Sequence, residues 1–410
     1  MVKTKQELEE HRRQRRMLID APEEFWNARP VLAAIRANAI RTLTAPEALL
    51  GAVLMRALAV VPWEVTYRSS VGVRTSLNAA AVLCGKSGGG KTMLESAARE
   101  AVTFPEEPRG FSAVRSGEAV VATLVGWQKG EDKRPYPGWL HEDHAVRVYF
   151  DEVGKLAQLG GRQGSTILEY LKEGVSGSDL GGQRSDGTGL TAAAGEYRAT
   201  FTVAAQPERA EVLLNEDAVA GGLPGRFLWF WLHTDERLPD DLTPVEPFAV
   251  PSVAWEFALD DVPEVVALPE MDAEHREHKH RANRGDVSAI DGHSLLVRVK
   301  VAVALMVLDG RAALTSEDWI LANAVMGHSD RTRERMQQAE TDRARRATER
   351  QADLAVALED RAERRKEQTV LDRMEVLMKG GLTFPQAQQR LNGNQKTILR
   401  DLVARGMVTA

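Results

Sequence analysis

The sequence predicts an α/β protein built around a parallel sheet, and three observations predict it. Apolar, strand-like runs at 77–84, 145–150, 197–205 and 227–232 alternate with helical patterns. The first run leads into a glycine-rich loop and then into a helix. The second run ends in two carboxylates, Asp151 and Glu152. Strands that alternate with helices favour a parallel sheet with helices packed against it.

Composition divides the chain into five regions. Residues 1–70 are an N-terminal helical region, because Pro22 and Pro46 with their following glutamates open two helices. Residues 71–240 contain the four strand-like runs and form the core. Residues 241–330 combine a proline-rich, acidic crossover with a helical lid of two amphipathic segments, 294–309 and 316–328. Residues 331–367 are a highly charged long helix or linker that has few large apolar side chains.

The last region, residues 368–410, predicts a helix-turn-helix or winged-helix-like domain. A helix over 369–378 is followed by a second helix, which a capping box formed by Thr383 and Gln386 opens. The turn at 392–394 leads to a third helix over 395–405, and residues 407–409 are expected to form a short strand.

Charge and composition narrow the class of protein. The formal net charge of the 410 residues is −6, but residues 331–410 contain 17 Lys and Arg against 12 Asp and Glu. A basic tail on an acidic body is compatible with local nucleic-acid contact, although charge alone favours a solvated charged helix. The single cysteine, Cys84, excludes an internal disulfide framework and indicates the cytoplasm. We expect no membrane span and no signal peptide.

A phosphate-binding motif follows the first apolar run. It fits the pattern G-x-x-x-x-G-K-[ST] at every fixed position, and its glycines let successive backbone N–H groups point at phosphate oxygens. Lys91 would reach the β- and γ-phosphates of ATP, and the Thr92 hydroxyl would bind Mg²⁺. The motif consists of Gly85, Lys86, Ser87, Gly88, Gly89, Gly90, Lys91 and Thr92.

Two carboxylates and one amide side chain extend this site. Asp151 would hold Mg²⁺ through water, and Glu152 would orient or deprotonate the attacking water. Gln206 ends the third run, where it would contact the γ-phosphate or its water unless it is an ordinary strand-end glutamine.

Two arginines are further candidates. Arg226 lies on a glycine- and proline-rich turn and would act as an arginine finger for a neighbouring subunit, unless it forms an internal salt bridge. Arg298 is a weaker candidate for a sensor arginine.

Two segments are candidates for nucleic-acid contact. Gln183 and Arg184 lie in a flexible loop that would track a nucleic-acid backbone or would be an ordinary surface loop. Gln395 and Lys396 begin the third helix of the C-terminal region and would contact duplex DNA. The eight tryptophans are scattered along the sequence and are interpreted as core residues rather than as base-stacking platforms.

Several segments resemble the helicase-like ATPase half of phage primase–helicases, from actinobacterial phages and mobile elements. The resemblance covers residues 22–330 and is found at 25–32, at 76–78 with the glycine loop, at 151–153, at 162–166, at 206–210 and at 226–229. It implies a RecA-like or AAA+-like fold, a homo-oligomeric ring with a hexamer favoured, ATP hydrolysis between subunits and movement along single-stranded DNA. No primase module precedes the ATPase, so DNA synthesis is not implied.

The sequence therefore predicts an ATP-dependent DNA helicase or single-stranded DNA translocase in phage or mobile-element DNA replication. The alternative is an ATP-switched initiator, loader, regulatory or defence ATPase without helicase activity, in which the C-terminal helices bind duplex DNA or a partner.

Overall fold

The structure is a computed structural model that divides into two compact units, Met1–Glu340 and Thr341–Ala410. It describes residues 5–72, 74–86, 90–107, 109–112, 114, 116–130, 135–150, 164–182, 189–233, 245–256 and 263–409.

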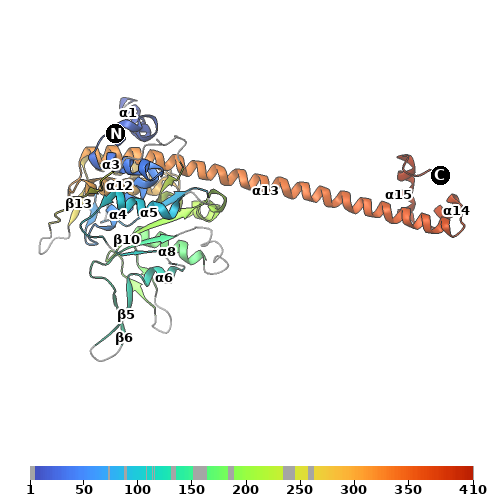
Figure 1. Ribbon diagram of the computed structural model, residues 1–410, viewed down its shortest axis with the longest axis horizontal. Coiled ribbons are helices and arrows are strands. Elements are labelled where there is room, and N and C mark those ends of the chain that lie inside the picture. Colours follow the sequence, from blue (N-terminus) through green and yellow to red (C-terminus); the bar gives the residue numbers. More distant parts are fainter. Residues whose placement is uncertain are drawn as a thin grey trace. The chain divides into compact units, whose positions relative to one another are not determined.

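A five-stranded, all-parallel sheet forms the centre of the first unit (Figure 1), and its strands lie in the order β11-β2-β10-β7-β4. Cys84 at the end of β2 pairs with Ala205 at the end of β10, and Phe150 of β7 pairs with Val203 of β10. The strands are β2 (Ala79–Cys84), β4 (Arg109–Phe111), β7 (Ala145–Phe150), β10 (Arg198–Ala205) and β11 (Phe227–Trp231). The predicted α/β architecture with a parallel sheet is confirmed.

Helices cover both faces of this sheet, which is why its strands are apolar without a strict alternation. Along β2, Ala81 and Leu83 belong to the core on one face, whereas Val82 and Cys84 belong to the core on the other. The first face is covered by α3 (Pro30–Arg41), α4 (Pro46–Ala59), α5 (Lys91–Ala101) and α12 (Ser294–Leu308). The second face is covered by α6 (Gly117–Val121), α8 (Gly164–Ser176) and α9 (Glu211–Leu214).

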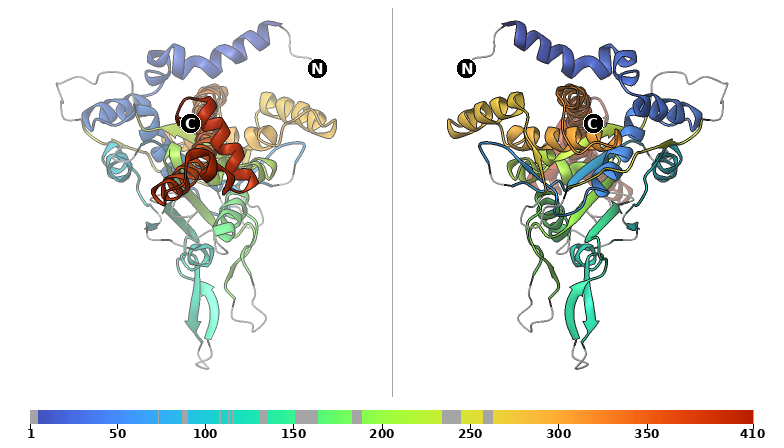
Figure 2. Two further views of the ribbon diagram at one scale, coloured as in Figure 1. Left: turned by 90° about the vertical axis from the view of Figure 1, so that its right-hand side faces the viewer. Right: turned by 90° about the vertical axis from the view of Figure 1, so that its left-hand side faces the viewer.

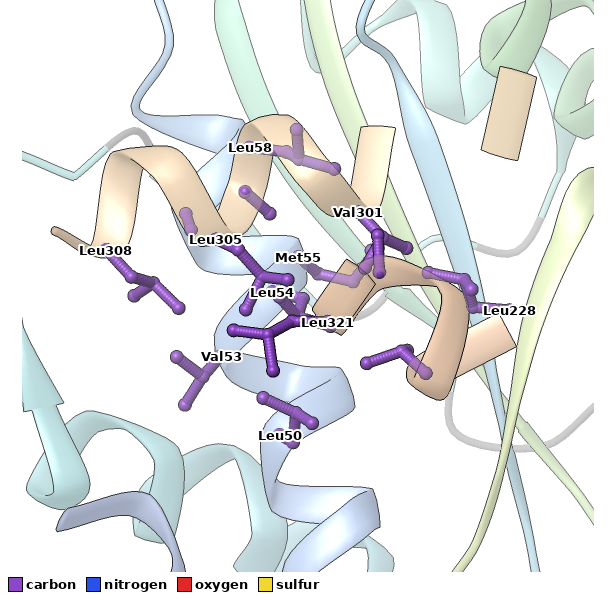
Figure 3. Packing of buried hydrophobic residues seen from close by; sticks show 14 of the residues in the cluster. Leu50, Val53, Leu54, Met55, Leu58, Leu228, Val301, Leu305, Leu308 and Leu321 are labelled. Atoms are coloured by element: carbon purple, nitrogen blue, oxygen red, sulfur yellow. The ribbon is translucent and has the colours of Figure 1, made fainter. Parts of the chain in front are cut away.

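The larger core lies where α4 packs between the sheet and α12 (Figure 3). Every residue of α4 from Ala48 to Ala59 is buried, and all of them except Arg56 are apolar or glycine, so this helix is buried on all sides rather than amphipathic. Leu54 of α4 and Leu305 of α12 are both fully buried. The N-terminal helical region is thus part of the core, and it also contains α1 (Lys5–Asp20) and α2 (Pro22–Trp26).

Gly51 of α4 allows this helix to approach β11 closely. A Cβ at this position would lie 2.4 Å from the ring of Phe230, which is fully buried. We expect Gly51→Ala to lower the free energy of unfolding by about 1–3 kcal/mol, because the ring must shift in a filled core. Denaturant unfolding measures this change. Gly393→Ala is the control, since its Cβ would meet open space. If Gly51→Ala were as stable as the wild type, the described packing would be contradicted.

The region between β2 and β7 contains several further elements of secondary structure. Besides β4 and α6 it holds an antiparallel hairpin, β5 (Val125–Lys129) with β6 (Pro135–Trp139). A second antiparallel pair, β8 (Leu180–Gly181) with β9 (Thr191–Ala192), precedes β10. Both pairs extend from the same side of the first unit (Figure 2). The remaining pairs are parallel and involve β1 (Thr66–Arg68) with β13 (Glu264–Val266), and β3 (Val102–Thr103) with β12 (Phe248–Ala249).

Short helices complete the first unit. The connection from β10 to β11 contains η2 (Pro207–Arg209), α10 (Glu216–Ala220) and η3 (Pro224–Arg226). After the crossover come α11 (Pro269–Asn283) and η4 (Asp291–His293). None of the helices in the described ranges is long and apolar enough to cross a lipid bilayer.

The long C-terminal helical region is continuous where the sequence predicted separate helices. The expected segments 316–328, 331–367 and 369–378 form one helix, α13 (Ser316–Lys379). Residues 328–379 contain neither Gly nor Pro, so nothing in the backbone chemistry interrupts the helix. It ends at Gly380 and Gly381, where Gly381 has a φ of +90°.

The second unit contains the end of α13 with α14 (Phe384–Gln389) and α15 (Gly393–Ala404). Val370, Met374, Ala387, Leu391 and Leu399 form its small core. The predicted capping box of Thr383 and Gln386 is confirmed. The expected strand at 407–409 is wrong, because these residues form bends and irregular chain without a strand partner.

Candidate functional site

Three neighbouring strands end at the edge of the sheet where the sequence predicts the site. β10 lies between β2 and β7, and all three run in the same direction. Gly85 follows β2, Gln206 follows β10, and Asp151 and Glu152 follow β7. The carboxyl edge of an open parallel sheet is where such folds bind their ligands. Asp151 and Glu152 themselves lie outside the described residues.

The glycine loop connects β2 to the N-terminus of α5 at this edge. Gly90 has a φ of +75°, a left-handed conformation that favours glycine, and it is the residue before the first turn of α5. The backbone N–H groups at the start of this helix are directed toward the loop, as anion-binding loops require. Ser87, Gly88 and Gly89 lie outside the described residues. Lys91 and Thr92 are the first two residues of α5, and their side chains are not among those described.

The start of the loop is fixed from both sides. The Gly85 N–H donates to the carbonyl of Ala205 at 3.0 Å, and the Leu232 N–H donates to the carbonyl of Cys84 at 2.8 Å. A Cβ on Gly85 would lie 2.9 Å from the Cβ of Leu232 and 3.1 Å from Nε2 of His233. The fixed glycine that opens the motif is therefore required here by close approach of the chain segment after β11.

His233 is a site residue that sequence reasoning missed. Its Nε2 accepts a hydrogen bond from the backbone N–H of Lys86 at 3.1 Å. The only signal in the sequence was its place directly after the fourth strand-like run. That signal becomes informative only when β11 is known to pair with β2.

Gln206 occupies the predicted position at the carboxyl edge. It directly follows Ala205, which pairs with Cys84 next to the glycine loop. It is half-buried, and its carbonyl accepts the N–H of Arg209 at the start of a short helical turn. Contact between its amide and a phosphate remains a prediction.

Arg226 lies at the opposite edge of the sheet. It precedes the first residue of β11, whereas the glycine loop lies beside the last. Its Nη1 donates to the carbonyl of Gly221 at 2.8 Å, and burial lowers the pKa of its guanidinium. Within the described ranges no carboxylate lies within ion-pair distance of it. Arg226 is thus not brought to the glycine loop of its own chain.

Arg298 packs between helices, and the sensor role that the sequence suggested stays a prediction. Its guanidinium pairs with Glu274 at 2.9 Å, donates to the carbonyl of Trp319 at 2.9 Å and covers the Trp319 ring at 3.5 Å. Burial lowers its pKa to about 10. These contacts fix α12 to α11 and α13.

The proposed nucleic-acid residues are distributed over two places. Gln183 and Arg184 fall between β8 and β9 and lie outside the described residues. In the second unit, the Gln395 side chain accepts the N–H of Asn392 at 3.1 Å, so it caps the N-terminus of α15. Lys396 lies on the same first turn and is half-buried.

No protein-family model matches this chain, and no curated protein matches it.

Proposed function

We propose that this chain is a P-loop ATPase that binds ATP with Mg²⁺ and uses its hydrolysis to move along single-stranded DNA. One observation carries the ATPase part. The motif Gly85–Thr92 lies between a buried parallel strand and the N-terminus of α5, and the strand that precedes Asp151 and Glu152 ends on the same edge, one strand away. The strand order, with β10 between β2 and β7, favours a RecA-like or AAA+-like ATPase. The single cysteine, Cys84, favours the cytoplasm.

The residues at this edge suit phosphoryl transfer to water. Lys91 and the backbone of the glycine loop bind the phosphates. Thr92 and Asp151 would hold Mg²⁺, which would neutralise charge on the β- and γ-phosphates. Glu152 orients the attacking water and accepts its proton, and Gln206 on the intervening strand is placed to contact that water or the γ-phosphate.

The placement of Arg226 favours sites shared between subunits. Arg226, at the amino edge of β11, is far from its own glycine loop along the strand, so a finger role requires the glycine loop of a neighbouring subunit. We therefore propose a homo-oligomeric ring, with six subunits favoured by the resemblance, in which Arg226 stabilises charge on the γ-phosphate of the adjacent subunit.

Mixing two inactive variants tests this arrangement. Arg226→Ala and Glu152→Ala rings are each expected to lose at least about 10²-fold in ATP turnover. Mixed rings contain some interfaces that combine an intact Glu152 with an intact Arg226, so part of the turnover is expected to return. Turnover that stays absent in rings shown by mass to be mixed would place Arg226 in a role within its own subunit.

An aromatic hairpin supports a nucleic-acid substrate. Trp127 on β5 is 47% exposed, so the expectation that every tryptophan lies in the core is wrong for this residue. Lys129 is exposed two residues further along the same face. At the base of the hairpin, the ring of His144 stacks on Trp139 at 4.0 Å and on Trp63 at 5.2 Å, which anchors the hairpin to the body. An exposed indole beside a cation is a surface on which unpaired bases stack.

Replacement of Trp127 tests the DNA contact. We expect Trp127→Ala to raise the single-stranded DNA concentration for half-maximal ATPase stimulation by about 5–100-fold, since stacking contributes about 1–3 kcal/mol per base. Turnover without DNA should not change. Leu140→Ala is the control, because Leu140 is similarly exposed, at 45%, near the same hairpin. Equal stimulation of wild type and Trp127→Ala would exclude this surface from DNA binding.

The second unit favours one alternative function, an ATP-switched protein that binds duplex DNA. Its last helix, α15, exposes Asn394, Thr397 and Arg400, and such polar side chains read base edges when a helix enters the major groove. Site-specific duplex binding without stimulation by single strands would favour this alternative over the motor.

A further inference from the structure

The first part of α13 is fixed along β11, the strand at one end of the parallel sheet. The backbone N–H of Trp229 donates to Oγ of Ser329 at 2.9 Å, so a helix side chain satisfies a donor that no neighbouring strand pairs. The ring of Phe230 stacks on His328 with 5.9 Å between ring centroids. Met336, two turns further along α13, is fully buried in the core on the second face of the sheet.

The contact between α13 and β11 continues to the carboxyl end of the strand. The guanidinium of Arg335 lies over the ring of Trp231, 4.0 Å from its centroid, within the range of a cation–π interaction. Trp231 meets His233 edge-to-face, with ring centroids 5.9 Å apart and an interplanar angle of 67°. A row of three side chains thus leads from α13 to the segment beside the glycine loop.

His233 completes this row at the loop itself. Because its Nε2 accepts the N–H of Lys86, the imidazole is neutral in this arrangement and carries its proton on Nδ1. The same Nε2 lies 3.1 Å from the position of a Cβ on Gly85. The imidazole therefore contacts the two residues at which the chain leaves β2 and begins to curl.

We propose that His233 is a positioning residue of the phosphate-binding loop, and that His233, Trp231 and Arg335 couple nucleotide binding to α13. This inference rests on the proposed ATPase function. The hydrogen bond to Lys86 restrains the loop before ATP arrives, so less conformational freedom is lost on binding. Any shift of Lys86 when ATP binds changes the contact of His233 with Trp231. It therefore changes the position of Arg335 over the Trp231 ring. Coupling of this kind is reciprocal, so a change at Arg335 must alter ATP affinity.

Substitution of His233 tests the positioning role. The full chain is titrated with a fluorescent ATP analogue, and its KM and kcat for ATP are measured. We expect His233→Ala to raise Kd and KM about 3–10-fold, the value of one hydrogen bond, with kcat within about twofold. His233→Gln should restore Kd to within about threefold of wild type, because its Oε1 reaches as far as Nε2 and accepts the same N–H. If Gln is as damaging as Ala, or if Ala leaves Kd unchanged, the positioning role is overturned.

A double-mutant cycle tests the coupling. We expect Arg335→Ala to raise Kd for the same analogue about 2–5-fold, and the double variant with His233→Ala to lose less than the product of the two single effects. The control is Arg331→Ala, which removes an exposed arginine one turn earlier on α13. This variant should leave Kd unchanged, and the double variant with His233→Ala should have the same Kd as His233→Ala alone. Multiplicative effects for Arg335 and His233 would show that the row of side chains carries no coupling.

Failure of this inference is distinguishable from failure of the ATPase proposal. A wild-type chain that does not bind ATP, or that binds it equally after Lys91→Ala, contradicts the ATPase function itself. Binding that depends on Lys91 but is insensitive to His233 contradicts only the role assigned to His233.

Discussion

Lys91→Ala is expected to abolish measurable ATP turnover, with a loss of at least about 10²-fold in kcat and weaker binding of ATP. The physical reason is that removal of the ammonium leaves charge on the β- and γ-phosphates uncompensated at the point where it increases in the transition state. Steady-state phosphate release and titration with a fluorescent ATP analogue measure the two effects separately.

Lys86→Ala is the matched control for this prediction. Lys86 belongs to the same loop and carries the same charge, but it occupies a variable position of the motif and its side chain is exposed. Its backbone N–H, which donates to His233, is retained in the variant. We expect turnover within about threefold of wild type. Equal losses in the two variants would indicate that general charge, and not the fixed lysine of the motif, is what the loop requires.

Glu152→Gln is expected to separate ATP binding from hydrolysis. The amide preserves the shape of the side chain but cannot accept the proton of the attacking water, so kcat should fall about 10²–10⁴-fold. The Kd for ATP should stay within about threefold of wild type, because Glu152 acts on the water rather than on the bound phosphates. A single-turnover experiment with radiolabelled ATP measures cleavage, and a filter-binding titration measures affinity.

Glu142→Gln serves as the control for loss of one negative charge near the same strand. Glu142 is exposed and precedes the start of β7, whereas Glu152 follows its end. This variant should hydrolyse ATP at the wild-type rate. If Glu152→Gln also hydrolysed ATP at that rate, the base would have to be sought elsewhere on the edge, with Gln206 unable to serve because an amide is not a base.

Local patterns predicted four of the five strands of the sheet, because these four are apolar and separated by helices. The fifth strand, β4, has the sequence Arg-Gly-Phe and was not predicted. The run 145–150 coincides with β7, and the runs around β2, β10 and β11 differ from the observed strands by only one or two residues at their ends. Gly85 and Gln206 directly follow the paired strand ends Cys84 and Ala205. These features depend on sequence neighbours alone, and the parallel connection then brings them together.

What the sequence did not show depends on contacts between distant segments. His233 becomes a site residue only because β11 pairs with β2, and Arg298 became a candidate only because its partners Glu274 and Trp319 were not visible as neighbours. The hairpin that exposes Trp127 was hidden by Pro135 and Pro137, which are tolerated there because a two-stranded hairpin consists of edge strands. The continuity of α13 was not predicted because the high charge of residues 331–367 is also typical of a linker. The absence of Gly and Pro from residues 328–379 is what allows one continuous helix.

The most direct test of the central proposal is ATP turnover by the purified chain, measured with Mg²⁺ at low salt across a titration of single-stranded DNA. We predict turnover that increases with DNA, saturates, and is absent from Lys91→Ala at every DNA concentration. Turnover that depends on Lys91 but stays flat through the titration would contradict the DNA motor. Turnover that is absent throughout, or that persists in Lys91→Ala, would contradict ATP hydrolysis at the glycine loop.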